Sequence, residues 1–192
     1  MKSFLVLVTL MMTLAAFPVQ AAKRVALVIG NNAYATLPNL NNAKKDAEGM
    51  AAKLRGLGFD VILKTNAGSR TIGRALADFE NRLAKADVAL VFYAGHGIQA
   101  NGKNHLIPSD ANIEVEEDLR FGSVDSQEFL HAMNRAGTPL NIVIIDACRD
   151  NPLPHRTRSA AHGLAIPAAP AGIKGTAIVL FGSTRTDGAG RP

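Results

Sequence analysis

The chain has 192 residues and a formal net charge of +5 at pH 7, from 21 Lys and Arg against 16 Asp and Glu. The basic residues are scattered, tryptophan is absent and there are only two tyrosines, so we read the charge as a solvated surface. Neither a nucleic-acid footprint nor a stacking platform for single strands is predicted.

The N-terminal segment, residues 1–22, is predicted to be a secretory signal peptide. Lys2 provides a positive start, residues 4–17 form a nearly continuous apolar core, and Val19 and Ala21 suit the −3 and −1 positions of a cleavage site. An uncleaved transmembrane anchor is the alternative, but the apolar run is shorter than the ~20 residues of a membrane span. We therefore expect a periplasmic or secreted protein with no stable membrane insertion after cleavage.

The rest of the chain, residues 23–192, alternates between short apolar strands and amphipathic helices. Strands are expected at 25–29, 59–63, 88–93, 140–145 and 176–181, and helices at about 43–57, 69–83 and 125–136. This alternation predicts a single α/β domain, a three-layer sandwich with a mostly parallel central sheet and helices on both faces. The abrupt polar end after the last strand suggests a domain truncated at its C-terminus, because sheet edges are normally covered.

Local signals predict the turns and the helix ends. Asn101-Gly102 indicates a hairpin over residues 98–108, and Gly137 is expected to end the third helix. Residues 112–122 are polar and without periodicity, so we expect them to be irregular. Helix caps are expected from neighbouring side chains, namely Asn41 or Asn42, Ser69 or Thr71, and Asp125 with Glu128 in a capping box.

Cys148, the only cysteine, comes just after the β-branched strand at 140–145. Ligands of open α/β sheets bind beyond the carboxyl ends of the strands. A single cysteine cannot form an internal disulfide, and an idle exposed thiol is a liability in an oxidising compartment. A buried cysteine acting as a small hydrophobic residue is the alternative. Its place past a strand end favours an accessible thiol that acts as a nucleophile.

His96 follows the strand at 88–93 and lies between Gly95 and Gly97, which let the backbone turn sharply. If this strand is adjacent to the one before Cys148, the imidazole can take the proton of the thiol and later protonate a leaving amine. The backbone N–H groups of Gly97 and Cys148 are the expected oxyanion donors. A structural histidine is the alternative, and the pairing with a lone cysteine makes it the weaker one.

Two carboxylates are expected at the same edge of the sheet. Asp146 ends an apolar run, where an unpartnered carboxylate is costly to bury, and Asp46 starts the helix that follows the first strand. Together they would favour an Arg or Lys side chain in a substrate. Alternatively, Asp46 complements the helix dipole and Asp146 pairs with Arg149. The two interpretations are balanced for Asp46, whereas the substrate pocket is favoured for Asp146.

Two sequence blocks resemble the His and Cys blocks of the caspase–metacaspase superfamily of cysteine peptidases. They are Tyr93-Ala94-Gly95-His96-Gly97 and Asp146-Ala147-Cys148-Arg149-Asp150. His96 precedes Cys148 by about 50 residues, which is the spacing of the caspase signature. Asp146 stands where animal caspases have Gln, as in metacaspases and bacterial orthocaspases. The resemblance extends over residues 23–181.

The resemblance implies a caspase–haemoglobinase fold and a cysteine endopeptidase, a thiol protease that hydrolyses peptide bonds. It places Asp46 and Asp146 in a pocket for a basic P1 residue, so the implied substrates are proteins or peptides cut after Arg or Lys. The chain departs from many metacaspases at Ala94, where they have serine, and at Ala43, where they have cysteine or proline. A catalytically silent caspase-like binding or regulatory module is the alternative function.

No metal or other cofactor is predicted. The remaining histidines show no metal-ligand spacing on a defined element. Some metacaspases need calcium, but nothing in the sequence identifies such a site. The acidic run of Glu114, Glu116, Glu117 and Asp118 is typical of a solvated loop.

Overall fold

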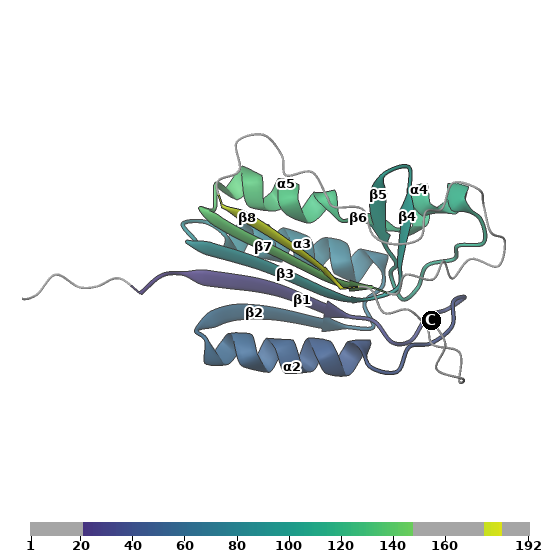
Figure 1. Cartoon of the computed structure of the whole chain (residues 1–192), viewed down its shortest axis with the longest axis horizontal. Helices are drawn as coiled ribbons and strands as arrows, with labels where there is room; N and C mark the ends of the chain where they lie inside the picture. The colour runs from purple at the N-terminus through teal and green to yellow at the C-terminus, as the bar shows by residue number, and fades with distance from the viewer. Residues whose placement is uncertain (1–20, 148–174, 182–192) are drawn as a thin grey trace, which may run out of the picture.

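The computed structural model describes residues 21–147 and 175–181, within which five parallel strands form a central sheet. The strands are β1 (Arg24–Gly30), β2 (Phe59–Thr65), β3 (Val88–Gly95), β7 (Leu140–Ala147) and β8 (Thr176–Phe181). They lie in the order β2-β1-β3-β7-β8, all pairs being parallel, so their carboxyl ends share one edge (Figure 1).

Helices cover both faces of this sheet (Figure 1). Helix α2 (Ala43–Gly56) lies on one face, and α3 (Ser69–Arg82) and α5 (Gln127–Ala136) lie on the other. Successive residues of a strand point to opposite faces. On β1, Ala26 and Val28 pack with α2, whereas Leu27 and Ile29 join the core beneath α3 and α5. The predicted three-layer α/β sandwich is confirmed.

The central strands are apolar because they are covered on both sides. All residues of β1 after Arg24 are buried, and β3 is buried from Ala89 onward. Strand β7 alternates, with its fully buried side chains toward α3 and α5 and its partly buried ones toward α2. The near-continuous hydrophobic runs in the sequence thus reflect a parallel sheet that is buried on both faces.

A small antiparallel sheet lies beyond the carboxyl ends of β1 and β3 (Figure 1). It consists of β4 (Gly97–Ala100), β5 (Lys103–Leu106) and β6 (Val124–Asp125). Its hairpin turn has φ of 51° at Asn101 and 74° at Gly102. Two successive positive φ angles are typical of the Asn-Gly turn in a two-residue hairpin, so this prediction is confirmed.

The expectation of an irregular segment at 112–122 was wrong. This segment contains the short 3-10 helix η1 (Glu116–Asp118) and the one-turn helix α4 (Leu119–Gly122). The Asp118 carboxylate accepts the N–H groups of Glu114, at 2.9 Å, and Val115, at 3.1 Å. These two hydrogen bonds lower the pKa of Asp118. The acidic run therefore includes a local capping residue, a role that its composition did not indicate.

The capping of α2 and α3 also differs from expectation. Asn42 lies at the N-cap of α2, yet its side chain makes no capping hydrogen bond in the part of the chain described. Instead the Oδ1 atom of Asn32 accepts the N–H of Lys44 at 2.6 Å. In α3, Asp110 Oδ1 accepts the N–H of Ser69 at 2.8 Å. Residues distant in sequence satisfy these helix N-termini, which neighbour-based reasoning could not find.

Helix α5 begins later than predicted. Asp125 belongs to β6, and Ser126 occupies the N-cap position. The predicted capping box is replaced by a single local hydrogen bond, 3.0 Å long, from the N–H of Gln127 to the Asp125 carboxylate. The C-terminal end is as predicted, because Gly137 follows the helix in the left-handed conformation with φ of 68°.

No helix within residues 21–147 and 175–181 is long and apolar enough to cross a lipid bilayer. The predicted signal peptide, except for its last two residues, lies outside the described part of the chain.

Candidate active site

His96 directly follows the last residue of β3, at the edge where β3 and β7 end in register. Gly95 is the register partner of Ala147, and Ala94 is the partner of Asp146. The predicted adjacency of the two strands is therefore confirmed. Cys148 lies outside the described residues, but in sequence it directly follows Ala147, as His96 directly follows Gly95. Gly95 and Ala147, which immediately precede the two predicted catalytic residues, are thus register partners on neighbouring strands.

The imidazole of His96 is held by a carbonyl group and an aromatic ring. Its Nε2 atom lies 2.7 Å from the carbonyl oxygen of Pro38. Because a carbonyl oxygen can only accept, Nε2 carries the proton and the lone pair of the neutral imidazole is on Nδ1. The ring of Tyr34 lies 4.6 Å away, centroid to centroid, at an interplanar angle of 53°. This buried histidine, 5% exposed, is thus held with its lone pair on Nδ1.

The backbone of His96 is also anchored on both sides. Its N–H donates to the hydroxyl of Tyr34 at 2.8 Å. Its carbonyl oxygen accepts from the N–H of Ile107 at 3.0 Å and from the hydroxyl of Tyr93 at 2.7 Å. Each of these anchors lies on a different element, so the position of His96 depends on three segments packing together.

The loop between β1 and α2 carries two of these contacts, Tyr34 and Pro38, and the sequence analysis missed both. The side chain of Asn39 ties the loop together by accepting the N–H of Tyr34 at 2.9 Å. The Thr36 hydroxyl donates to the carbonyl of Ala111 at 3.0 Å, which fastens the loop to the segment after β5. The partners are distant in sequence, so no local pattern could have identified these contacts.

Asn31, which the sequence analysis also missed, is a buried polar link between the two sheets. It is fully buried and its N–H donates to the carbonyl of Ala94 at 2.9 Å. Its side chain accepts the N–H of Ala67 at 2.8 Å and donates to the carbonyl of Ile107 at 3.3 Å. A buried polar side chain needs such partners. In the sequence, the position of Asn31 directly after an apolar strand could have indicated this buried polar role.

Gly97, a predicted oxyanion donor, lies at the start of β4, opposite Leu106. Since His96 accepts a ladder hydrogen bond from Ile107, the neighbouring pair of Gly97 and Leu106 is at a non-hydrogen-bonded position of the ladder. The N–H of Gly97 therefore points away from β5. The other predicted donor, the N–H of Cys148, lies outside the described residues.

Helix α2 approaches the sheet closely at its first turns, and this brings Asp46 to the carboxyl edge. A Cβ atom on Gly30 would come within 2.5 Å of both the carbonyl oxygen of Ala43 and the Cβ of Ala47. Only glycine permits this contact. Asp46, exposed on the first turn of the helix, is consequently held over the ends of the strands.

Asp146 lies on the same face of the sheet as α2. Ile142 and Ile144 pack into the core beneath this helix, and the alternation of β7 places Asp146 on the same side. Burial raises the pKa of Asp146, and the nearby charge of Asp46 raises it further. The two predicted carboxylates therefore lie within electrostatic range of each other. Arg149, the alternative partner of Asp146, lies outside the described residues.

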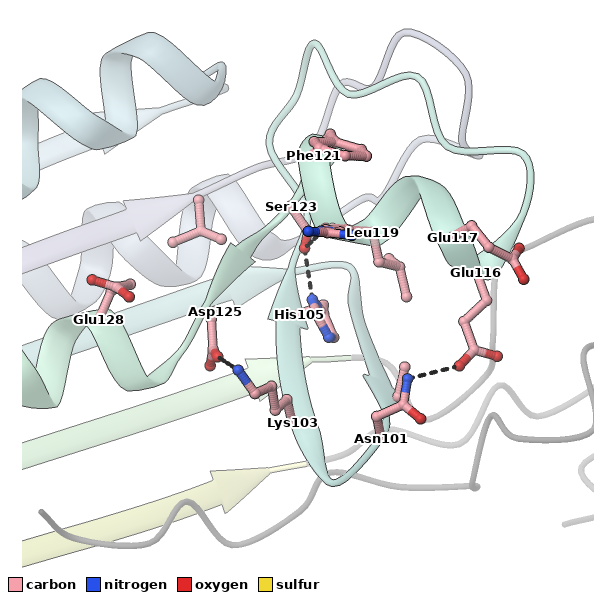
Figure 2. Close-up of a pocket in the computed structure, with 13 residues that line it drawn as sticks. Asn101, Lys103, His105, Glu116, Glu117, Leu119, Phe121, Ser123, Asp125 and Glu128 are labelled. Carbon is pink, nitrogen blue, oxygen red and sulfur yellow. Dashed lines mark hydrogen bonds and ion pairs between the residues drawn. The ribbon is translucent and has the colours of Figure 1, made fainter.

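A cavity of about 830 Å³ lies between the β4–β5 hairpin and the η1–α4 segment (Figure 2). Its side chains include three interacting pairs, Lys103–Asp125 at 3.0 Å, His105–Ser123 at 2.8 Å and Asn101–Glu116 at 3.4 Å. Partial burial lowers the pKa of His105. Of the predicted site residues that the structure describes, none lines this cavity, so it is separate from the carboxyl edge of the main sheet.

Residues 21–147 and 175–181 contain no group of three or more His, Cys, Asp or Glu side chains arranged to hold an ion.

Comparisons with curated proteins show which relatives the chain resembles. It is 29% identical over 169 residues to human mucosa-associated lymphoid tissue lymphoma translocation protein 1, covering 88% of this chain and 19% of that protein. It is 31% identical over 135 residues to caspase b of Danio rerio, covering 66% of this chain and 31% of that protein. The chain therefore spans less than a third of the length of either relative.

A solved structure and a family match complete the comparison. The fold is similar to that of protein GSU0716 from Geobacter sulfurreducens, with a TM-score of 0.52 and 23% identity over 66% of this chain and 50% of that one. The family described as "Caspase domain" matches residues 23–187, which is nearly everything after the predicted signal peptide. On the extent of this match, the chain belongs to the caspase domain family.

Proposed function

We propose that this chain is a cysteine endopeptidase in which Cys148 is the nucleophile and His96 its general base, with cleavage after Arg or Lys. The observation that carries the proposal is the register of β3 and β7, which pairs Gly95 with Ala147 immediately before the two residues. Membership of a peptidase family supports the reaction class. The orientation of His96, with its Nε2 proton bound to Pro38, supports the role of the histidine.

The proposed reaction begins with transfer of the Cys148 proton to Nδ1 of His96. The resulting thiolate attacks the carbonyl carbon of the scissile peptide bond and forms a tetrahedral intermediate. His96 then returns the proton to the nitrogen of the leaving amine as the C–N bond breaks. Water, deprotonated by the same imidazole, hydrolyses the thioester and restores the thiol. The Pro38 carbonyl favours this cycle because it stabilises the imidazolium formed in both halves.

The oxyanion of each tetrahedral intermediate would be stabilised by the backbone N–H groups of Gly97 and Cys148. The outward direction of the Gly97 N–H, away from β5, supports this assignment. Backbone donors fixed before the reaction need no reorganisation when charge develops on the oxygen.

The preference for a basic P1 residue would come from Asp46 and Asp146. Burial has the larger effect on the pKa of Asp146, and the nearby charge of Asp46 raises this pKa further because two like charges repel. A guanidinium or ammonium group placed between them would remove this repulsion and make charge-assisted hydrogen bonds. An acidic P1 side chain would add a third negative charge.

The test is hydrolysis of fluorogenic peptides that differ only in P1, as Arg, Lys or Asp. The wild-type protein is compared with Cys148→Ala and His96→Ala, and Ser123→Ala, which removes a hydroxyl bonded to the Leu119 carbonyl, serves as a control within the same fold. We expect turnover of the Arg and Lys peptides that both active-site variants abolish and the control retains. Equal background signals from wild type and Cys148→Ala would favour the alternative, a silent caspase-like binding module.

We also propose that the protein acts in the periplasm or outside the cell, after removal of the signal peptide. The apolar core and the small residues near Ala21 support export. N-terminal sequencing of the protein from the exported fraction tests this, because retention of Met1 in the cytoplasmic fraction alone would contradict it.

A further inference from the structure

Both tyrosines of the chain bond the main chain of His96. Tyr34 comes from the loop after β1, and Tyr93 comes from β3. We propose that these two residues, the tyrosine clamp, position His96 for proton transfer. The inference rests on the proposed peptidase function, in which His96 is the base, and assigns Tyr34 and Tyr93 as positioning residues.

The clamp supplies an acceptor for the His96 N–H, the role that a carbonyl of β5 has in a regular ladder. In a regular antiparallel pair, His96 and Ile107 would exchange two backbone hydrogen bonds. The bond from the Ile107 N–H to the His96 carbonyl is made, at 3.0 Å. The His96 N–H donates to Tyr34 instead, while the Tyr93 hydroxyl lies 2.7 Å and 3.1 Å from the carbonyl oxygens of His96 and Ile107. His96 can therefore leave the ladder without an unsatisfied buried backbone group.

One loop fixes both the backbone and the ring of His96. Tyr34 accepts the backbone N–H through its hydroxyl and packs its ring 4.6 Å from the imidazole. Pro38, four residues further along, binds Nε2 through its carbonyl oxygen. Rotation of the imidazole would break contacts with both residues. Preorganisation of this kind matters because a general base works only when its lone pair is held toward the proton it accepts.

The two tyrosine hydroxyls take up the space above Gly95. A Cβ atom at this position would lie 2.5 Å from the Tyr93 hydroxyl and 2.6 Å from the Tyr34 hydroxyl. The two hydroxyls thus converge directly on the glycine that precedes His96. Any larger residue at position 95 would displace the groups that hold the histidine, which gives this glycine a role beyond backbone flexibility.

The first experiment measures hydrogen exchange of the His96 amide by NMR in the Cys148→Ala protein, which requires no turnover. Tyr34→Phe keeps the ring and removes only the hydroxyl. Ser123→Ala is the control, since it removes a hydroxyl that donates to a backbone carbonyl, that of Leu119, outside the β1–α2 loop. We expect His96 exchange to become at least about tenfold faster in Tyr34→Phe and to be unchanged in the control. Unchanged exchange in Tyr34→Phe would overturn the inference.

The second experiment separates positioning from structure by the kinetics of the otherwise wild-type enzyme on an Arg peptide. In Tyr34→Phe we expect kcat to fall about 10- to 100-fold, because the base is misplaced, while KM stays within about twofold. Gly95→Ala should give the same kcat-specific loss, and Ser123→Ala should change neither constant. A normal kcat in Tyr34→Phe would overturn the positioning role. If the wild type cleaves no peptide, the peptidase proposal fails, whereas the exchange experiment still decides whether the clamp holds His96.

Discussion

Asp146, at the end of β7, lies within electrostatic range of Asp46, on the first turn of α2. Burial raises the pKa of Asp146 and the Asp46 charge raises it further. The two residues are a hundred positions apart in sequence and reach each other only because α2 packs closely on Gly30 and β7 turns Asp146 to the same face. If this pair binds a basic P1 side chain, both its selectivity and its effect on stability can be measured.

The first prediction concerns selectivity. In Asp146→Asn, kcat/KM for Arg peptides should fall about 10- to 100-fold, because a partly buried charge partner of the guanidinium is lost. Asp46→Asn should have a smaller effect, of about threefold to tenfold, since Asp46 is exposed and screened by solvent. The measurement is the kinetics of matched Arg and neutral peptides. Equal losses on both peptides would contradict a role in P1 recognition.

The second prediction concerns the stability of the same carboxylate. Because the pKa of Asp146 is raised in the folded state, that state binds the proton more tightly than the unfolded chain does. Stability is therefore lost as pH rises from the ordinary value of 3.8 through the raised pKa, and the ionised form is destabilising at neutral pH. Asp146→Asn should raise Tm at pH 7 and have no such effect below pH 3.8.

Thermal unfolding of both proteins in a Cys148→Ala background, which removes the proposed nucleophile, checks the second prediction. A Tm at pH 7 that is equal to or lower than that of the parent would show that Asp146 is stabilised by a partner in the folded protein.

The third prediction tests the close packing of α2. Gly30→Ala should destabilise the protein by ~1–3 kcal/mol, because its Cβ would clash with the Ala43 carbonyl and with Ala47. Gly49→Ala is the matched control on α2, where a Cβ meets nothing within 4 Å. It should stabilise the helix by ~0.5–1 kcal/mol. Urea unfolding measures both, and similar midpoints for the two variants would be inconsistent with the packing described.

The fourth prediction concerns metal removal. The proposed chemistry needs a thiol, an imidazole and backbone N–H donors, so hydrolysis of Arg peptides should stay within about twofold after treatment with EDTA. The measurement is turnover before and after dialysis against the chelator, with calcium added back in a parallel sample. Loss of activity that calcium alone restores would show that an ion is required.

Much of the fold was predictable because its signals are local. The strand before His96 and the strand before Cys148 are short, β-branched apolar runs, and such runs are typical of strands that are buried on both faces. The Asn101-Gly102 turn and the Gly137 helix end each depend on backbone angles that few residues adopt. These elements follow from residue type alone, whatever the rest of the chain does.

The surroundings of His96 could not be predicted in this way. Tyr34 lies 62 positions before His96 and Pro38 lies 58 positions before it, in a loop without periodicity. The one-turn helix after Asp118 was missed because a polar stretch carries no hydrophobic pattern. The predicted residues were those whose chemistry is conspicuous, whereas the missed ones act through geometry that exists only in the folded chain.

The exact register of β3 and β7 limits how this sequence can change over time. Substitutions within β7 alter packing locally. Loss or gain of a single residue within β7, ahead of Asp146, would instead turn the Asp146 carboxylate to the opposite face of the sheet. The same change would shift the residues that follow in sequence by about 3.3 Å along the strand relative to His96. Homologues of this domain should therefore vary in the lengths of their loops while the spacing within these two strands stays constant.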